Sequence, residues 1–175
     1  MLEIEIKVRV SDTEAIKNQI LKKGGRHSET TVEDDTYYNA PHRDFGKTDE
    51  ALRVRCAGGK TTVTYKGPKD TIMGSKVREE YNVNIDDAES FGTILKNLGF
   101  RTVAKVKKLR EYYTYEDFSI ALDNVEGLGT FIEIELITEN EINKAARRVD
   151  QLAEELGVTG ERISISYLEL LLSKH

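Results

Sequence analysis

Apolar and charged residues alternate along much of this chain, with the period of two that is typical of β-strands. In residues 2–10, every second side chain is apolar and most of the others are charged. The same alternation predicts further strands at roughly 32–39, 51–57, 61–67, 75–85, 102–115, 117–124 and 130–137. Short glycine-containing turns separate several of these segments, among them Gly58-Gly59 and Gly127-Leu128-Gly129. The pattern therefore predicts about eight strands.

Four other segments have apolar residues at helical spacing. They are predicted to run from Ser11 to Gly24, from Asp86 to Gly99, from Thr138 to Gly157, and from about Glu161 to the end of the chain. The first three begin at the spacing of a capping box and end at a glycine, which are ordinary start and stop signals.

Charged residues gather on one face of the predicted strands, and each such face carries both signs or pairs with a face that does. They are Glu3, Glu5, Lys7 and Arg9; Arg53 and Arg55; Lys66; Lys76, Arg78 and Glu80; Lys108 and Arg110; Asp123; and Glu133 and Glu135. Two architectures accommodate this pattern. An open sheet would turn its charged face to water. A closed barrel would line its interior with charges and pack helices on its apolar outside, against Ile4, Ile6, Val54, Ile132 and Ile134. The alternation alone leaves both open.

The composition limits the possible functions of the chain more than it limits the possible folds. The 175 residues suit one domain, residues 1–175, and 33% of them are charged, against roughly 25% in an average soluble domain. A net charge of -5 argues against non-specific nucleic-acid binding. No apolar run is long enough for a transmembrane helix, and the alternating N-terminus does not resemble a signal peptide. The single cysteine, Cys56, fits a cytoplasmic protein, and its place on the apolar side of its strand predicts a small core residue.

The charged face suggests a chemistry. Carboxylates with almost no histidine or cysteine suit Mg²⁺ or Mn²⁺, and arginine and lysine suit phosphate oxygens. Acidic and basic groups on one surface are what a metal–triphosphate complex requires. A network of cross-strand salt bridges is the alternative explanation for the same residues.

Several motifs resemble the CYTH, or triphosphate tunnel, superfamily, which includes class IV adenylyl cyclases, thiamine triphosphatases and inorganic triphosphatases. Glu3-Ile-Glu5-Ile-Lys7 is similar to the ExExK signature of that superfamily. The other matching segments follow in family order: Asp35–Tyr38, Arg43–Phe45, Leu52–Arg55, Thr64–Lys66, Arg78–Glu80, Lys108–Arg110, Asp123 before Gly127–Gly129, and Phe131–Glu135. The resemblance implies an α+β fold with a closed eight-stranded antiparallel barrel, a charged interior and helices outside. The stretches Arg43–Arg55 and Ser166–Leu171 look most like the class IV adenylyl cyclase branch.

The resemblance also implies roles for individual residues. Metal ligands would be Glu3, Glu5, Asp123, Glu133 and Glu135, with Mg²⁺ or Mn²⁺ as the cofactor. Triphosphate would be held by Lys7, Arg53, Arg55, Lys66, Lys76, Arg78, Lys108 and Arg110, of which Lys7, Lys108 and Arg110, together with Glu5, would be catalytic. A small-molecule triphosphate is the expected partner, without nucleic acid or membrane, and a homodimer is compatible with the resemblance.

Three functions remain open at this point. The first is conversion of ATP to cyclic AMP and pyrophosphate. The second is hydrolysis of thiamine triphosphate or inorganic tripolyphosphate. The third is non-catalytic binding of triphosphate or polyphosphate, for which so many metal ligands would be unnecessary.

Overall fold

The computed structural model describes residues 2–72 and 75–174, without the side chains of residues 71–72 and 75–76. The strands are β1 (Leu2–Arg9), β2 (Arg26–Asn39), β3 (Ala51–Ala57), β4 (Lys60–Lys66), β5 (Asp70–Ile72), β6 (Ser75–Arg78), β7 (Glu80–Ile85), β8 (Arg101–Tyr115), β9 (Phe118–Val125) and β10 (Gly129–Thr138). The helices are α1 (Thr13–Lys22), α2 (Phe45–Thr48), α3 (Ala88–Asn97), α4 (Ile142–Glu155) and α5 (Tyr167–Leu172).

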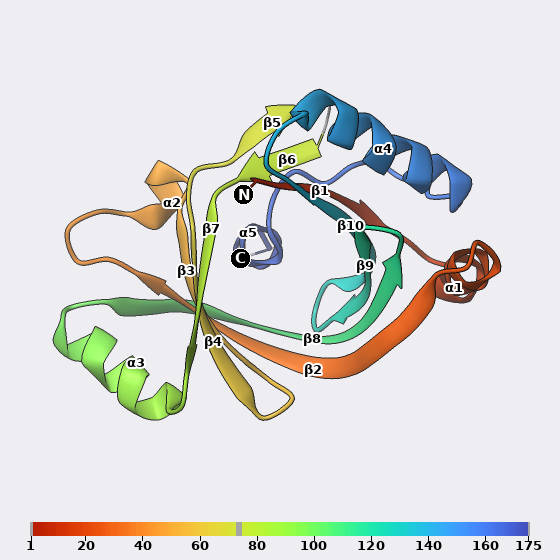
Figure 1. The fold of residues 1–175 in the computed structure, drawn as a ribbon. Coiled ribbons are helices and arrows are strands. Elements are labelled where there is room, and N and C mark those ends of the chain that lie inside the picture. Colours follow the sequence, from red (N-terminus) through yellow and green to blue (C-terminus); the bar gives the residue numbers. More distant parts are fainter. Residues whose placement is uncertain (1, 73–74, 175) are drawn as a thin grey trace.

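All ten strands belong to one antiparallel sheet, in the order β5-β6-β1-β10-β9-β8-β2-β3-β4-β7. Figure 1 shows this sheet curling round into a barrel, with β6 and β7 meeting near the top. The prediction of a charged antiparallel barrel is therefore confirmed. The barrel is nearly but not fully closed, because no ladder joins β7 to β6 or β1 within the described residues. The predicted count of about eight strands is too low. Residues 75–85 form two strands that break at Glu79 and lie toward opposite ends of the sheet, and β5 was not predicted.

The outer surface carries the larger apolar core. Ile4 and Ile6 of β1 and Ile132 and Ile134 of β10 are buried in one cluster that also contains apolar residues of α1 and α4. These four residues point outward as the alternation predicted, because side chains on one strand alternate between the two faces of the sheet. Val54 is also buried, but it belongs to neither apolar cluster of the described residues.

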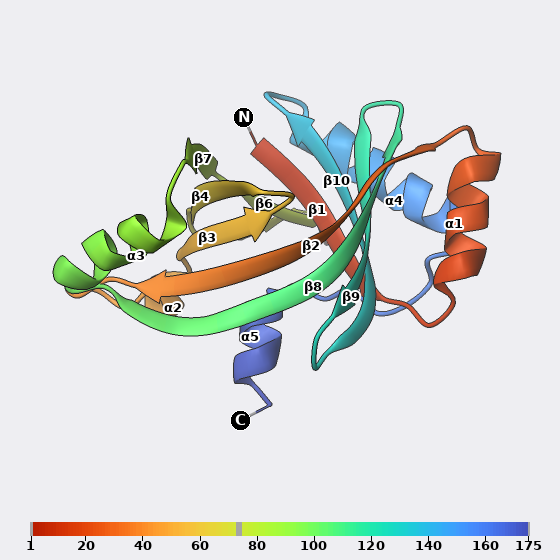
Figure 2. The ribbon, with the colours of Figure 1, turned by 90° about the horizontal axis from the view of Figure 1, so that it is seen from below.

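The C-terminal helix departs from the prediction. α5 has six residues instead of a helix beginning near Glu161, since Arg162 forms a β-bridge with Val8 and Ser166 caps the helix. It does not pack on the outside of the barrel with α1 and α4. Figures 1 and 2 show α5 at one end of the tunnel, seen nearly end-on in Figure 1, and Tyr167 is buried there against Phe131 and Val106.

Smaller differences concern the helix ends and Cys56. α2 was not predicted, and the capping residues of α1, α3 and α4 are Asp12, Asp87 and Glu141 instead of Ser11, Asp86 and Thr138. Cys56 is exposed, so its prediction as a core residue is wrong. Among the described helices, none is long and apolar enough to cross a membrane.

Candidate active site

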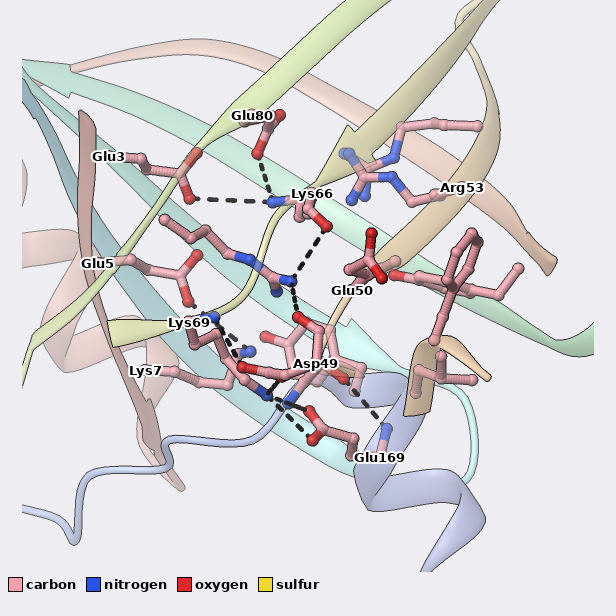
Figure 3. Close-up of a pocket in the computed structure, with 18 of the residues that line it drawn as sticks. Glu3, Glu5, Lys7, Asp49, Glu50, Arg53, Lys66, Lys69, Glu80 and Glu169 are labelled. Carbon is pink, nitrogen blue, oxygen red and sulfur yellow. Dashed lines mark hydrogen bonds and ion pairs between the residues drawn. The ribbon is translucent and has the colours of Figure 1, made fainter. Parts of the chain in front are cut away.

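The barrel encloses a cavity of about 430 Å³, a size within the usual range of ligand pockets. Most of the predicted site residues line it: Glu3, Glu5, Lys7, Arg53, Arg55, Lys66, Arg78, Lys108, Arg110, Glu133 and Glu135. Figure 3 shows Glu3, Glu5 and Lys7 projecting from β1 into the same space as Lys66, Lys69 and Arg53. The side chain of Lys76 lies outside the described residues, and Asp123 is buried beside the cavity.

Carboxylates crowd one wall of the cavity. Glu5 lies directly opposite Glu135 in the β1–β10 ladder, a position where like charges repel. Burial and the charges of Glu5 and Glu133 raise the pKa of Glu135 to about 7. Burial raises the pKa of Glu3 to about 9, with neighbouring carboxylates adding to the rise and Lys66 opposing it. Burial and the neighbouring carboxylates therefore raise both pKa values and favour the protonated forms of Glu3 and Glu135.

This donor set suits a divalent cation. Mg²⁺ is commonly held by one or two carboxylates together with substrate phosphates, and oxygen is the ligand atom it prefers. Within the described part of the chain, no group of three or more acidic, histidine or cysteine side chains is arranged so that it could hold a metal ion by itself. An opposed pair such as Glu5 and Glu135, with Glu3 alongside, fits a cation that completes its coordination with substrate.

Asp123 has a different set of partners from the other predicted ligands. Its Oδ1 accepts a hydrogen bond from Arg110 Nε at 2.6 Å, and its Oδ2 accepts from Tyr167 Oη at 2.6 Å. Arg110 also pairs with Glu133, which lies 3.1 Å from Lys7 Nζ. Asp123 thus fixes Arg110 and Tyr167, and its role as a metal ligand stays a prediction.

A second buried network fixes the phosphate-binding candidates on β3 and β8. Arg55 makes a bidentate contact with Asp35, at 2.7 and 2.8 Å, and Lys108 Nζ lies 2.8 Å from Glu33 and 3.3 Å from Asp35. Burial opposes ionisation of Asp35, but the hydrogen bond from Arg55 and the nearby cations hold its pKa well below the usual range. Burial and the two neighbouring guanidinium groups lower the pKa of Lys108. Paired carboxylates of this kind are what keeps clustered cations stable inside a protein.

Arg53 is bound less firmly than Arg55. Its Nη1 is 4.0 Å from Asp35, its Nη2 donates to Thr64 Oγ1 at 3.3 Å, and its buried Nε finds no acceptor among the described residues. An unsatisfied buried donor carries a free-energy cost that an incoming phosphate oxygen would remove. Arg53 is therefore the basic residue best prepared for an anionic ligand.

Lys66 and Arg78 also have partners within the protein. Lys66 Nζ lies 2.5 Å from Glu80 and 3.9 Å from Glu3. Arg78 donates to the carbonyl oxygens of Gly67 and Asp49, so it ties β6 to the chain beyond β4 and α2. Phosphate binding by these two residues stays a prediction.

Several residues of this site received no role from the sequence, and four of them belong to its charged networks. Glu33 and Asp35 share the inward face of β2, and the alternation of 32–39 could have identified them. Lys69 follows β4 and bonds both Asp49 and Glu169, while Tyr167 lies under Lys7 with Nζ 4.2 Å from the ring centroid. No local pattern indicates Lys69 or Tyr167, because their positions depend on how α5 packs on the barrel.

Comparison with known proteins decides the family. The model of the CYTH domain matches residues 1–164. The chain belongs to the CYTH family. A Methanocaldococcus jannaschii protein provisionally named an adenylate cyclase is 42% identical over 174 residues, which cover 97% of this chain and 98% of that protein. An Aeromonas hydrophila protein named adenylate cyclase is 27% identical over 169 residues, covering 92% of this chain and 83% of its own.

Solved structures agree with the CYTH fold. A Pyrococcus horikoshii protein is 40% identical and superposes with a TM-score of 0.89, covering 99% of both chains. A Hippeastrum protein described as having a dominant triphosphatase activity has the same fold at 21% identity, with a TM-score of 0.72 and 98% and 96% coverage. The barrel of this chain is thus the tunnel of its family.

Proposed function

We propose that this protein is a metal-dependent adenylate cyclase that converts ATP to cyclic AMP and pyrophosphate. The observation that carries the proposal is the opposed pair Glu5 and Glu135 in the same cavity as Arg53. The buried Nε of Arg53 has no hydrogen-bond acceptor among the described residues. The two carboxylates can bind the metal ion and Arg53 can bind phosphate oxygens, and a metal–triphosphate complex needs both kinds of contact. The names of the Methanocaldococcus and Aeromonas relatives support the choice of reaction.

The basic residues would bind the phosphate chain. Arg53 is positioned to donate to phosphate oxygens, and Arg55, Lys108 and Lys7 line the same cavity. Arginine binds such oxygens through two parallel hydrogen bonds, whereas lysine acts as a point charge. Since Asp35 and Glu33 hold Arg55 and Lys108 in place before substrate arrives, little reorganisation is required on binding.

The reaction itself would depend on position and charge. The 3′-oxygen of ATP forms a bond to the α-phosphorus, the bond from that phosphorus to the bridging oxygen breaks, and pyrophosphate leaves. The hydroxyl proton passes to solvent. Negative charge grows on the leaving group, where Lys7 and Arg110 would stabilise it.

A divalent cation, Mg²⁺ or Mn²⁺, would be held by Glu5 and Glu135 together with substrate phosphates, with Glu3 and Glu133 adjacent. When bound, it would neutralise phosphate oxygens and lower the barrier to attack by the hydroxyl group. Glu133 is paired with Lys7 and Arg110, so it links the carboxylate wall to the basic residues.

Product analysis tests the proposal. The purified protein is incubated separately with ATP, thiamine triphosphate and tripolyphosphate, each with Mg²⁺ or Mn²⁺. We expect cyclic AMP and pyrophosphate in equal amounts from ATP. Free phosphate from any of the three would instead support a triphosphatase, which would use the same residues with water as the nucleophile. Binding without turnover would support a non-catalytic triphosphate sensor.

A further inference from the structure

Two rows of matching side chains cross the inward face of β3, β4 and β7. Each row contains an arginine of β3, a threonine of β4 and an asparagine of β7, and its members lie directly opposite one another in the ladders. The rows are Arg53, Thr64 and Asn82, and one step along the strands Arg55, Thr62 and Asn84. Residues directly opposite each other share a face of the sheet and can interact. Because the rows have the same composition, a difference in their contacts indicates a difference in what they do.

The row of Arg53 forms a continuous chain of hydrogen bonds. Arg53 Nη2 donates to Thr64 Oγ1 at 3.3 Å, and Thr64 Oγ1 donates to Asn82 Oδ1 at 2.6 Å. The amide Nδ2 of Asn82 donates to Glu80 at 3.0 Å, and Glu80 lies 2.5 Å from Lys66 Nζ (Figure 3). The chain therefore joins two phosphate-binding candidates of β3 and β4 through an asparagine of β7.

The donors and acceptors allow only one direction along this chain. The carboxylate of Glu80 is paired with Lys66 and only accepts, so the group of Asn82 that faces it is the amide NH₂. Oδ1 of Asn82 then faces Thr64 and accepts its single hydroxyl hydrogen. The lone pairs of Thr64 Oγ1 are left for Arg53, whose guanidinium group has only donors. Asn82 thus fixes the hydroxyl group of Thr64 as an acceptor for Arg53.

This acceptor is important for Arg53 because the arginine has few other partners. Among the described residues, its one hydrogen bond goes to Thr64, and its one ion pair, with Asp35, is 4.0 Å long. Thr64 is buried, so water cannot replace its hydroxyl group if that group is removed. The orientation of the Arg53 guanidinium group therefore depends on Thr64.

The second row lacks this connection. Thr62 Oγ1 donates to Asn84 Oδ1 at 3.0 Å, as the corresponding residues do in the first row. Arg55, however, binds Asp35 and Glu33, and within the described part of the chain no hydrogen bond joins it to Thr62. Thr62 and Asn84 therefore provide a control of the same chemistry on the same strands.

We propose that Thr64 and Asn82 are positioning residues that orient the guanidinium group of Arg53 toward the phosphate chain of the substrate. Neither residue lines the cavity, so they act through Arg53 and not by touching the ligand. This inference rests on the proposed function, since it requires a triphosphate in the cavity. It applies to tripolyphosphate as well as to ATP, because Arg53 would contact phosphate oxygens in both.

The test measures the dissociation constant of tripolyphosphate with Mg²⁺ by calorimetry on folded variants. Thr64→Val keeps the shape of the side chain and removes the hydroxyl group, whereas Thr64→Ser keeps the hydroxyl group. Asn82→Ala removes the group that orients the hydroxyl. Thr62→Val and Asn84→Ala are the matched controls from the second row. Thr64→Val is also combined with Arg53→Ala, to show whether Thr64 acts through Arg53.

We expect Thr64→Val to weaken binding about tenfold, because a buried hydrogen bond to a charged group is lost. Asn82→Ala should weaken it less, about threefold, since Asn82 is exposed and water can bond Thr64 in its place. Thr64→Ser and both controls should stay within about twofold of wild type. In the Arg53→Ala variant, Thr64→Val should cause no further loss, because changes that remove the same contact do not add.

Three results would overturn the inference. They are wild-type binding by Thr64→Val, equal losses for Thr64→Val and Thr62→Val, and a full further loss when Thr64→Val is added to Arg53→Ala. The last two would show a general effect on the strands instead of an effect on Arg53. Failure of the wild-type protein to bind tripolyphosphate would overturn the proposed function itself.

Discussion

Lys7 Nζ lies 4.2 Å from the centroid of the Tyr167 ring, so the C-terminal helix provides a surface for the lysine of the N-terminal ExExK motif. The hydroxyl group of Tyr167 donates to Asp123, which in turn accepts from Arg110. A single side chain of α5 therefore lies against Lys7 and, at 5.7 Å, Lys108, and it positions Arg110 through a carboxylate. Cation–π contacts and buried hydrogen bonds of this kind are each worth about 1–2 kcal/mol.

The first prediction separates these two contacts. Tyr167→Phe keeps the ring and removes the hydroxyl group, and we expect kcat to fall about tenfold, because a hydrogen bond to a charged group is worth about 1.5–3 kcal/mol. Tyr167→Leu also removes the ring and should lower kcat further. Steady-state kinetics and a thermal melt are measured on both. A Phe variant that melts earlier but turns over at the wild-type rate would show a purely structural role.

The second prediction concerns Arg53. Triphosphate with Mg²⁺ should raise the melting temperature, since a ligand that binds only the folded state stabilises it. Arg53→Ala should remove most of this rise, and Arg53→Lys should restore little of it because the bidentate geometry is lost. Arg148→Ala is the control, an arginine that pairs with Asp117 outside the cavity. If the shift were the same in wild type and Arg53→Ala, then Arg53 does not bind phosphate.

The third prediction concerns the opposed carboxylates. Glu135→Gln keeps the size of the side chain and removes its charge, so it should relieve the repulsion with Glu5 while weakening metal binding. We expect turnover to fall by about 100-fold or more at limiting Mg²⁺ and the metal-free protein to melt at the same or a higher temperature. Glu126→Gln in the exposed β9–β10 turn serves as the matched control. Wild-type turnover by Glu135→Gln would exclude Glu135 as a metal ligand.

The fourth prediction follows from the raised pKa values of Glu3, about 9, and Glu135, about 7. Between their ordinary value near 4.5 and these values, the folded protein binds more protons than the unfolded chain, so the free energy of unfolding falls as pH rises. The metal-free protein should therefore melt progressively earlier from pH 5 to pH 9.

Mg²⁺ competes with those protons, so it should reduce this decline and bind more tightly as pH rises through 7. Melting curves with EDTA and with Mg²⁺ across this range measure both effects. In the Glu135→Gln variant, the fall in melting temperature that wild type shows near pH 7 should be absent. Asp35 affects the free energy of unfolding at lower pH. Because its pKa is lowered in the folded protein, the stability contributed by its ionised form is lost only as pH falls below about 4. A flat profile for the metal-free protein between pH 5 and 9 would contradict the prediction.

Much of the barrel and its charged interior could be predicted because strand parity alone decides which side chains share a face. Glu5 and Glu135 illustrate this well, although their direct opposition depends on a register that the sequence does not reveal. Cys56 shows the limit of parity. Its side of the strand was predicted correctly, but parity does not tell which outward side chains another element covers, and Cys56 is exposed.

Breaks in the alternation were harder to foresee. Residues 75–85 keep their period of two across Glu79, so nothing in the pattern indicates that β6 and β7 separate there. A β-bulge of β8 at Val103 likewise appears only when β8 is paired with β2. Tyr167 and Lys69 enter the site through the packing of α5, a tertiary effect with no local signal in the sequence.

The pairing of β1 with β10 has a consequence for how the protein is made. Glu5 lies on β1 and emerges from the ribosome long before Glu135 on β10, because strands β2–β9 are synthesised between them. Contacts between such distant segments slow folding, because the loop must close before the pairing stabilises it. A nascent or truncated chain that lacks β10 should therefore be unable to assemble the carboxylate wall, and metal binding would report on completed folding.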